Sequence, residues 1–243
     1  SRSGKTFIII YALIVRALKY KGSKHLCIRR HFNHIKLSLF MQTIPEVLKI
    51  AFPEVDYEVN KSDYYFKIGD SEIWVAGSDD KDRVEKILGT EWDSIYFNEA
   101  SQITYDIYEV FLTRLNPKNG IKPLMVIDQN PGRLTSWTYL KFHKLINPET
   151  KAALDVKVIN NQGYLLMNPT DNIDNLSVEY IDTLESMSEA KKKRFLRGEY
   201  SDDSLNAMWK REWINNNRCI TLPDNIQRKI IAVDPAVTGN ENS

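Results

Sequence analysis

The sequence predicts an α/β protein in which a mainly parallel sheet lies between two layers of helices. Short apolar runs that suit buried strands alternate along the chain with longer runs that suit helices. Three of these strands end directly in polar or charged residues, at Arg29-Arg30, Asn98-Glu99 and Asp128-Gln129. The carboxyl ends of parallel strands meet at one edge of a sheet, and ligands bind in the crevice there.

The order of the elements follows from the apolar runs and the turn residues between them. A helix is expected over 7–19, where three consecutive isoleucines require tertiary burial to remain helical. A hairpin is expected over 57–76, with Gly69-Asp70 at its turn. The other expected helices lie at 35–50, within 78–91, at 103–115 and at 136–145, and the other strands at 25–28, 94–97 and 124–127.

The pattern changes after Trp137. A strand is expected near 156–159, then a polar stretch over 168–172, one long helix over 177–196 and a last strand over 230–233. The boundaries predict a first domain at 1–159, a small lid subdomain at 160–226 and the start of a further domain at 227–243. The chain has no internal repeat and no low-complexity tract.

Composition limits the class of protein. No apolar run approaches the ~18 residues of a membrane helix, and the first 20 residues do not read as a signal peptide. The two cysteines, Cys27 and Cys219, have no metal-binding spacing and fit a reducing compartment. The formal net charge of +1 gives no argument for nucleic-acid binding, which would need a local patch or several copies of the chain.

The first six residues, Ser1-Arg2-Ser3-Gly4-Lys5-Thr6, match the second half of the phosphate-binding pattern G-x-x-x-x-G-K-[ST]. In that loop, backbone N–H groups surround the phosphates, the lysine reaches the β- and γ-phosphates, and the hydroxyl binds Mg²⁺. The motif predicts ATP and Mg²⁺ as ligands. A simple basic helix start is disfavoured, because a lysine in the first turn opposes the helix dipole without an anion. The first glycine of the pattern and the strand that feeds the loop are expected before Ser1.

Asn98-Glu99 follows a buried strand and suits the motif whose first residue orients Mg²⁺ and whose second activates water. Asn98 stands where an aspartate is usual and offers only a neutral carbonyl oxygen, so it should hold Mg²⁺ less firmly. Asp93 cannot replace it, since five residues of strand separate them by about 16 Å. Asp128, at the end of a neighbouring strand, is a second candidate ligand. Two polar residues at a strand end with no catalytic role remain an alternative.

Asn130 is a candidate sensor, because an amide at a strand end can contact both the γ-phosphate and the attacking water. An ordinary Asn-Pro turn is the alternative. Arg2 can stabilise charge on the γ-phosphate as an arginine finger does, with Arg29 and Arg30 as rivals and a surface role open for each. Cys27, His31 and His34 lack a fourth metal ligand. The basic run at 191–194 is either a solvated helix face or a contact to the DNA backbone.

The order of these motifs resembles the large terminase subunit of tailed bacteriophages, the motor that packages DNA into proheads. The resemblance lies in SRSGKT, IRR, LGTEWDSIYFNEA, IDQNPG, MNPTDNIDNL, FLRGEY and IAVDPA, which cover nearly the whole chain in family order. It implies a RecA-like P-loop ATPase domain of the ASCE type with a lid, followed by an RNase H-like nuclease. It assigns Lys5 and Thr6 to phosphate and Mg²⁺, Glu99 to catalysis, Asn130 to coupling and Asp234 to the first metal-binding carboxylate of the nuclease.

The resemblance also implies partners and a place of action. The implied partners are double-stranded DNA, the portal protein, the small terminase subunit and further copies of the chain in a ring. The implied place of action is the prohead in the host cytoplasm, with no membrane involved. The chain ends nine residues after Asp234. A two-metal nuclease site needs several acidic ligands. We therefore expect this piece alone to be neither a nuclease nor a self-sufficient ATPase. The alternatives are a helicase, which would need a second RecA-like half, and a nucleotide-binding scaffold without catalysis.

Overall fold

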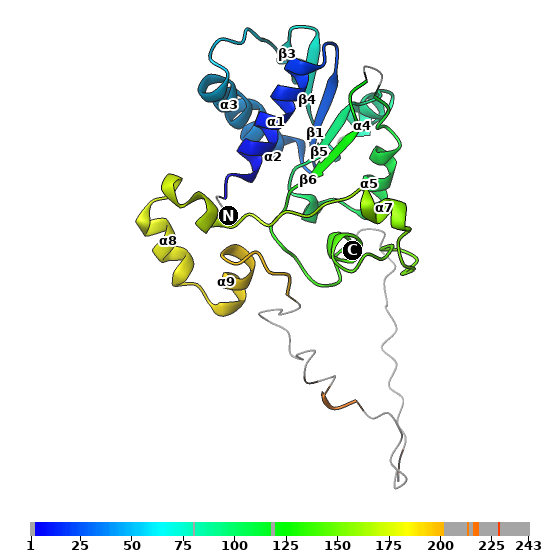
Figure 1. Cartoon of the computed structure of the whole chain (residues 1–243), viewed down its shortest axis with the longest axis vertical. Coiled ribbons are helices and arrows are strands. Elements are labelled where there is room, and N and C mark those ends of the chain that lie inside the picture. The colour runs from blue at the N-terminus through cyan, green and yellow to red at the C-terminus, as the bar shows by residue number, and fades with distance from the viewer. Residues whose placement is uncertain are drawn as a thin grey trace. The chain divides into compact units, whose positions relative to one another are not determined.

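The computed structural model of the chain describes residues 3–79, 81–117, 120–201, 213, 216–218 and 228, with the backbone alone at 81–83 (Figure 1). The chain divides into two compact units, Ser1–Asp203 and Ser204–Ser243, and every element named below belongs to the first. Ser1, Arg2, Cys219, the expected strand at 230–233 and Asp234, with the expected start of an RNase H-like domain, lie outside the described residues. Within the described part of the chain, no helix has the length and apolar character needed to cross a membrane.

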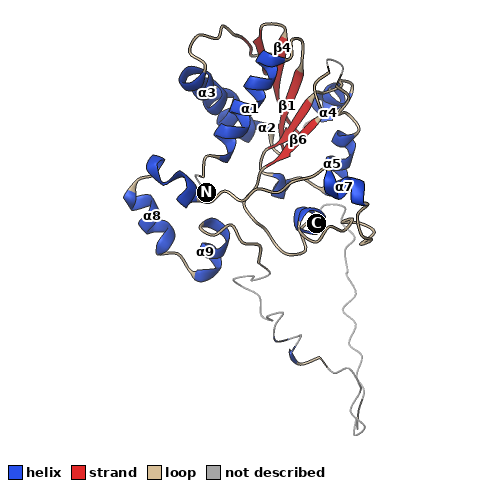
Figure 2. Ribbon diagram, viewed as in Figure 1, coloured by secondary structure: helices blue, strands red, loops and turns tan. Residues whose placement is uncertain are grey.

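A six-stranded mixed sheet with the order β2-β3-β4-β1-β5-β6 forms the centre of this unit (Figure 2). The four strands β4, β1, β5 and β6 run parallel to one another. The hairpin adds β3 and then β2 with antiparallel pairing. The predicted α/β fold with a mainly parallel sheet is confirmed. The strands are β1 (Lys24–Arg29), β2 (Glu58–Asn60), β3 (Tyr65–Ile68), β4 (Ser71–Gly77), β5 (Ser94–Phe97) and β6 (Leu124–Ile127).

Helices cover both faces of the sheet, so the unit has three layers (Figure 1). Successive side chains of a strand point to opposite faces. In β1, Cys27 packs into the core beneath α1 and α3, whereas Leu26 and Ile28 pack into the core beneath α4 and α5. The helices are α1 (Lys5–Lys19), α2 (Phe32–Ile35), η1 (Lys36–Thr43), α3 (Ile44–Ala51), α4 (Lys81–Leu88), η2 (Ala100–Gln102), α5 (Tyr105–Leu112), α6 (Trp137–Phe142), α7 (Val156–Asn160), η3 (Pro169–Asn175), α8 (Val178–Glu185) and α9 (Glu189–Phe195).

The predicted strand at 156–159 is wrong, because these residues form the helix α7. The alternation Val-Lys-Val-Ile resembles a strand, but Val156 is 68% exposed instead of facing a core. Asp155 favours the helix, since its side chain accepts a hydrogen bond from the N–H of Lys157 at 2.7 Å. The alternating pattern therefore does not mark a half-buried strand here.

The predicted single helix over 177–196 is also wrong, because it is broken into α8 and α9. The first helix begins at Ser177, whose side chain caps it, and a second serine, Ser188, precedes α9. Serine competes with the backbone for hydrogen bonds and therefore favours helix ends over helix interiors. We call η3, α8 and α9 the lid helices. The boundaries predicted for the lid subdomain, 160–226, remain a prediction.

Candidate active site

The phosphate-loop motif forms the start of α1. Gly4 lies just before the helix with φ +77°, a left-handed conformation that glycine adopts without strain. Its carbonyl oxygen accepts the hydrogen bond of Ile8 N at 3.1 Å, so the helix begins directly after it. Lys5 Nζ donates to the buried Ser3 Oγ at 2.8 Å. The unpaired N–H groups of a helix N-terminus favour an anion, as the sequence predicts for this loop.

Two carboxylates from neighbouring strand ends lie near Lys5. Asp128 directly follows β6 and is buried, and Glu99 lies two residues beyond the end of β5. Burial lowers the pKa of Lys5, while the negative charges of Asp128 and Glu99 act in the opposite direction. Burial raises the pKa of Asp128, and the charge of Lys5 partly offsets this rise. Lys5, Glu99 and Asp128 therefore meet at one edge of the sheet, as the sequence predicts.

Asn98 uses its amide nitrogen to hold Asp128. Its Nδ2 donates to Asp128 Oδ1 at 3.2 Å, and its Oδ1 accepts from Arg29 Nη1 at 3.5 Å. This orientation is the one that the partners require, because a carbonyl oxygen turned toward a carboxylate would be repelled. In this hydrogen-bonded pair, Asp128 is thus the ionisable acid and Asn98 the neutral partner. Direct ligation of Mg²⁺ by the Asn98 carbonyl remains a prediction that this orientation does not favour.

Tyr96 joins these groups and was missed by the sequence analysis. It is fully buried in β5, and its hydroxyl accepts a hydrogen bond from Asn98 Nδ2 at 2.9 Å. The same hydroxyl is hydrogen-bonded to Thr6 and to Asp128. Burial raises the pKa of this phenol well above its usual value, so it stays protonated. Tyr96 therefore connects the hydroxyl of the phosphate loop to the buried carboxylate.

The backbone of Glu99 is strained. Its φ of 59° and ψ of 53° place it in the left-handed region, which is uncommon for a residue with a long side chain. Two contacts hold this turn: Glu99 N donates to Asp128 Oδ1 at 2.9 Å, and Ala100 N donates to the Asp128 carbonyl at 2.9 Å. The side chain of Glu99 accepts a hydrogen bond from Asn130 Nδ2 at 3.4 Å. The predicted general base and the predicted sensor are thus in contact.

The candidate arginines, Arg29 and Arg30, differ in their surroundings, and Asp93 lies apart from them. Arg29 reaches Asn98, and its Nε is buried without a hydrogen-bond partner in the described part of the chain. Arg30 is exposed. Asp93 lies at the opposite end of β5, where its Oδ2 accepts from Lys24 N at 2.7 Å. Asp93 thus lies away from Asn98 and Asp128, whereas Arg29 contacts Asn98 directly.

No group of three or more histidine, cysteine or acidic side chains that could hold a metal ion occurs among the described residues. Cys27 is buried in the core, and His31 Nδ1 is paired with Asp79 Oδ2 at 2.9 Å.

Asn172, in the first of the lid helices, lies against the phosphate loop. A β-carbon at Gly4 would stand 3.7 Å from the Asn172 side chain. The backbone of Asn172 leaves helical geometry, with φ −126° and ψ 27°, and so interrupts η3 at this point. The sequence analysis recognised the polar stretch but could not place it beside residues far away in the chain.

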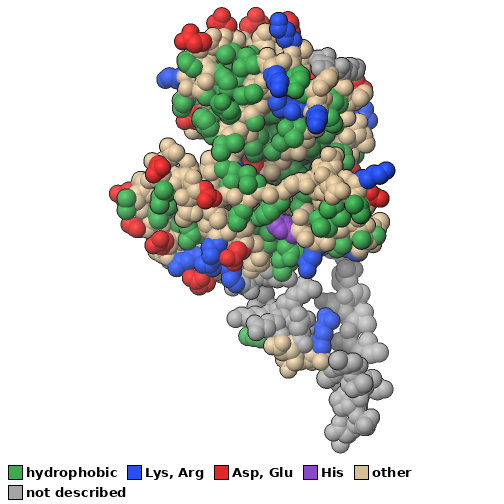
Figure 3. Space-filling view, in the orientation of Figure 1, with side chains coloured by type: hydrophobic (Ala, Val, Ile, Leu, Met, Phe, Trp, Pro, Cys, Tyr) green, Lys and Arg blue, Asp and Glu red, His purple; other side chains and the backbone are tan. Residues whose placement is uncertain are grey.

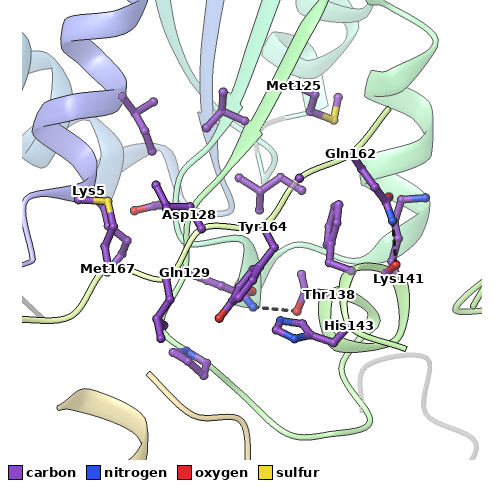
Figure 4. Close-up of a pocket in the computed structure, with 18 of the residues that line it drawn as sticks. Lys5, Met125, Asp128, Gln129, Thr138, Lys141, His143, Gln162, Tyr164 and Met167 are labelled. Carbon is purple, nitrogen blue, oxygen red and sulfur yellow. Dashed lines mark hydrogen bonds between the residues drawn. The ribbon is translucent and has the colours of Figure 1, made fainter. Parts of the chain in front are cut away.

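A cavity of about 1060 Å³ runs from Lys5 and Asp128 along the outer edge of β6. On the described chain, β6 pairs with β5 on one side only, and its four residues are half-buried. Apolar side chains gather on this face of the molecule (Figure 3). Figure 4 shows Asp128 and Gln129 at the carboxyl end of the sheet, and Tyr164, from the segment after α7, among the residues that line the cavity.

The sheet order and the helix start at Gly4 define an α/β fold of the P-loop type. A family model described as the phage terminase large subunit matches residues 1–200, and the chain belongs to that family. The resemblance predicted from the motifs is confirmed. No curated protein sequence matches the chain.

Solved structures show the same fold. The large terminase of a thermophilic bacteriophage matches with a TM-score of 0.64 and 14% identity over 82% of this chain and 46% of that one. The complex of that terminase with ADP matches with a TM-score of 0.63 and 14% identity over the same shares, 82% and 46%. The ATPase domain of the Thermus phage P74-26 large terminase matches with a TM-score of 0.52 and 15% identity, over 82% of this chain and 85% of that one. The chain thus spans less than half of the first of these terminases.

Proposed function

We propose that this chain carries the ATP-hydrolysing site of a phage DNA-packaging motor. The observation that supports this most is the meeting of Lys5, Glu99 and Asp128 beside the N-terminus of α1. Membership of the terminase large-subunit family supports the same function. Structures of the thermophilic phage terminase in complex with ADP and with ATP-γ-S support nucleotide as the ligand.

ATP binds with its β- and γ-phosphates at the start of α1, where Lys5 and the backbone N–H groups neutralise their charge. The groups present fit Mg²⁺, since a hydroxyl on Thr6 and a buried carboxylate on Asp128 are the oxygen ligands that this ion prefers. Bound Mg²⁺ supplies neutralisation of phosphate charge.

Glu99 accepts the proton of the attacking water, in the role of a general base. Asn130 donates to Glu99 at 3.4 Å, which supports a role as the sensor that holds this carboxylate and contacts the water. Arg29 or Arg2 supplies a further positive charge as the γ-phosphate is cleaved. The strain at Glu99 is consistent with a residue whose position is set by function.

The whole protein couples this reaction to movement of double-stranded DNA into the prohead. Asn130 and the lid convert ATP hydrolysis into movement along the DNA. The partners are the portal protein, the small terminase subunit and further copies in a ring, on the prohead in the host cytoplasm. Asp234 belongs to a nuclease site that is completed elsewhere in the protein. Family membership favours this motor over a helicase. A measurement of ATP turnover distinguishes the motor from a nucleotide-binding scaffold without catalysis.

Nucleotide binding tests the proposal directly. Lys5→Ala in the intact protein should weaken binding of a fluorescent ATP analogue at least about tenfold, because it removes a charge-assisted phosphate contact. Lys61→Ala, which removes an exposed lysine near the hairpin, is the matched control. Equal binding by both variants and the wild type would contradict the proposed site.

A further inference from the structure

The segment Arg197-Gly198-Glu199-Tyr200 is the part of the family motifs that the proposed chemistry leaves unexplained. Gly198 has φ +66°, and a β-carbon there would stand 2.5 Å from Leu166 Cδ1 and 2.7 Å from Asn168 Oδ1. The chain that leaves the lid helices thus touches the chain that enters them. Glycine is required at this crossing for both its conformation and its size.

Two residues later, Tyr200 is anchored to the end of β6. Gln129 Nε2 donates to the Tyr200 hydroxyl at 2.5 Å and to Thr138 Oγ1 at 2.8 Å, and the Tyr200 hydroxyl donates to Thr138 Oγ1 at 3.4 Å. Thr138 is only 3% exposed, and Gln129 and Tyr200 are half-buried, so these contacts are partly shielded from water. Figure 4 shows Gln129 and Thr138 directed toward each other.

The ring and the backbone reinforce this anchor. The Tyr200 ring packs against Tyr139 at 5.1 Å and against His143 at 4.8 Å between centroids. Ser201 N donates to the carbonyl of Gly132 at 3.2 Å. The exit from the lid is therefore fixed to both sides of the turn that follows β6.

That turn also carries catalytic groups. Gln129 lies between Asp128, which holds the backbone of Glu99, and Asn130, which contacts the Glu99 side chain. The Asn130–Glu99 distance of 3.4 Å is at the long end of the hydrogen-bond range, so a small displacement of the turn would break it. The turn thus links the lid exit to Glu99 through described contacts.

We propose that Tyr200 is a positioning residue for ATP hydrolysis. Together with Thr138 it fixes the Gln129 amide, and through it the turn from which Asn130 reaches Glu99. The position of the lid and the geometry of the general base are then set together. This inference rests on the proposed ATPase function and adds the residue that joins the lid to the reacting groups.

Tyr200→Phe tests it in the intact protein, because the ring contacts remain and only the hydroxyl is lost. We expect kcat to fall about tenfold, as for a misoriented catalytic group, with KM for ATP within about twofold of the wild type. Tyr139→Phe is the matched control, since it removes a hydroxyl from the same aromatic cluster and no described contact joins that hydroxyl to Gln129. Its kcat should equal that of the wild type.

Hydrogen exchange of the peptide spanning 129–133, measured without nucleotide, gives a readout that does not depend on activity. We expect faster exchange in Tyr200→Phe than in Tyr139→Phe or the wild type. An unchanged kcat in an active protein, or unchanged exchange, would overturn the positioning role alone. Parallel losses of kcat, nucleotide affinity and melting temperature would indicate a structural role and also overturn it. No difference between the wild type and Glu99→Gln would instead remove the ATPase function itself.

Discussion

Asn98 and Asp128 form a hydrogen bond between neighbouring strands, with Asn98 Nδ2 3.2 Å from Asp128 Oδ1. One strand end thus contributes a neutral amide and the next contributes the carboxylate. Asn98 stands where the sequence pattern calls for an acid, and a buried acid is present one strand away. Replacement of the usual aspartate therefore does not remove negative charge from this site.

Asn98→Asp should place two carboxylates in contact and destabilise the metal-free protein by roughly 1–3 kcal/mol. Mg²⁺ should restore more stability to this variant than to the wild type, and turnover should need less Mg²⁺ for half-saturation. Thermal unfolding in EDTA and in Mg²⁺ measures the first effect, with the exposed Asn33→Asp as the control. An unchanged or higher Mg²⁺ half-saturation in turnover would show that residue 98 does not act at the metal.

Tyr96→Phe should lower stability by about 1–2 kcal/mol, since it leaves the buried amide of Asn98 with one partner fewer. It should also weaken Mg²⁺ binding, because the link between Thr6 and Asp128 is lost. Tyr108→Phe is a suitable control, as it removes a buried hydroxyl at a distance from this network. Equal denaturation midpoints and equal Mg²⁺ titrations for the two variants would contradict the role given to Tyr96.

Asp128 should make stability depend on pH. Its pKa in the folded protein is raised above the usual 3.8, mainly because burial penalises its charged form. Its contribution to stability is therefore fully present below pH 3.8 and is lost as the pH rises through the raised folded value. In metal-free buffer, Asp128→Asn should become more stable relative to the wild type as the pH rises from that point. Chemical denaturation across this window measures the difference, and a difference that shrinks with rising pH would contradict it.

Gly198→Ala should loosen the lid helices. The substitution forces a β-carbon into a left-handed backbone and against Leu166 and Asn168, at a cost of roughly 1–3 kcal/mol. Faster hydrogen exchange over 189–201 is the expected result. Gly163→Ala is the matched control, because no described atom lies within 4 Å of a β-carbon there. Equal exchange in both variants would show that the crossing at Gly198 does not hold the lid.

The sheet could be predicted from the sequence because its strands are short apolar runs that end in polar residues. The expected strands at 25–28, 94–97 and 124–127 agree with β1, β5 and β6 to within a residue at each end. The segment at 156–159 was mispredicted, since alternation alone does not supply a neighbouring strand and Asp155 caps a helix instead. The break between α8 and α9 lies between Ser186, which ends α8, and Ser188, which precedes α9, and the charged helical pattern conceals it.

The candidate site was predictable where residue type determines chemistry, as for Lys5 and Glu99. Tyr96 was not predictable, because a tyrosine within an apolar strand looks like a core residue until its hydroxyl is placed. The direction of the Asn98 amide depends on a partner 30 residues away, which no local pattern reveals. Tyr200 is 71 residues from Gln129, and only the folded chain brings them together.

The central claim is that Glu99 activates water for ATP hydrolysis, and steady-state ATP turnover by Glu99→Gln in the intact protein tests it most directly. The variant keeps the size and hydrogen bonding of the side chain but loses the base, so turnover should fall about 100-fold or more while ATP binding persists. Glu85→Gln, at an exposed position of α4, should retain wild-type turnover. Turnover by Glu99→Gln equal to that of Glu85→Gln would contradict the account.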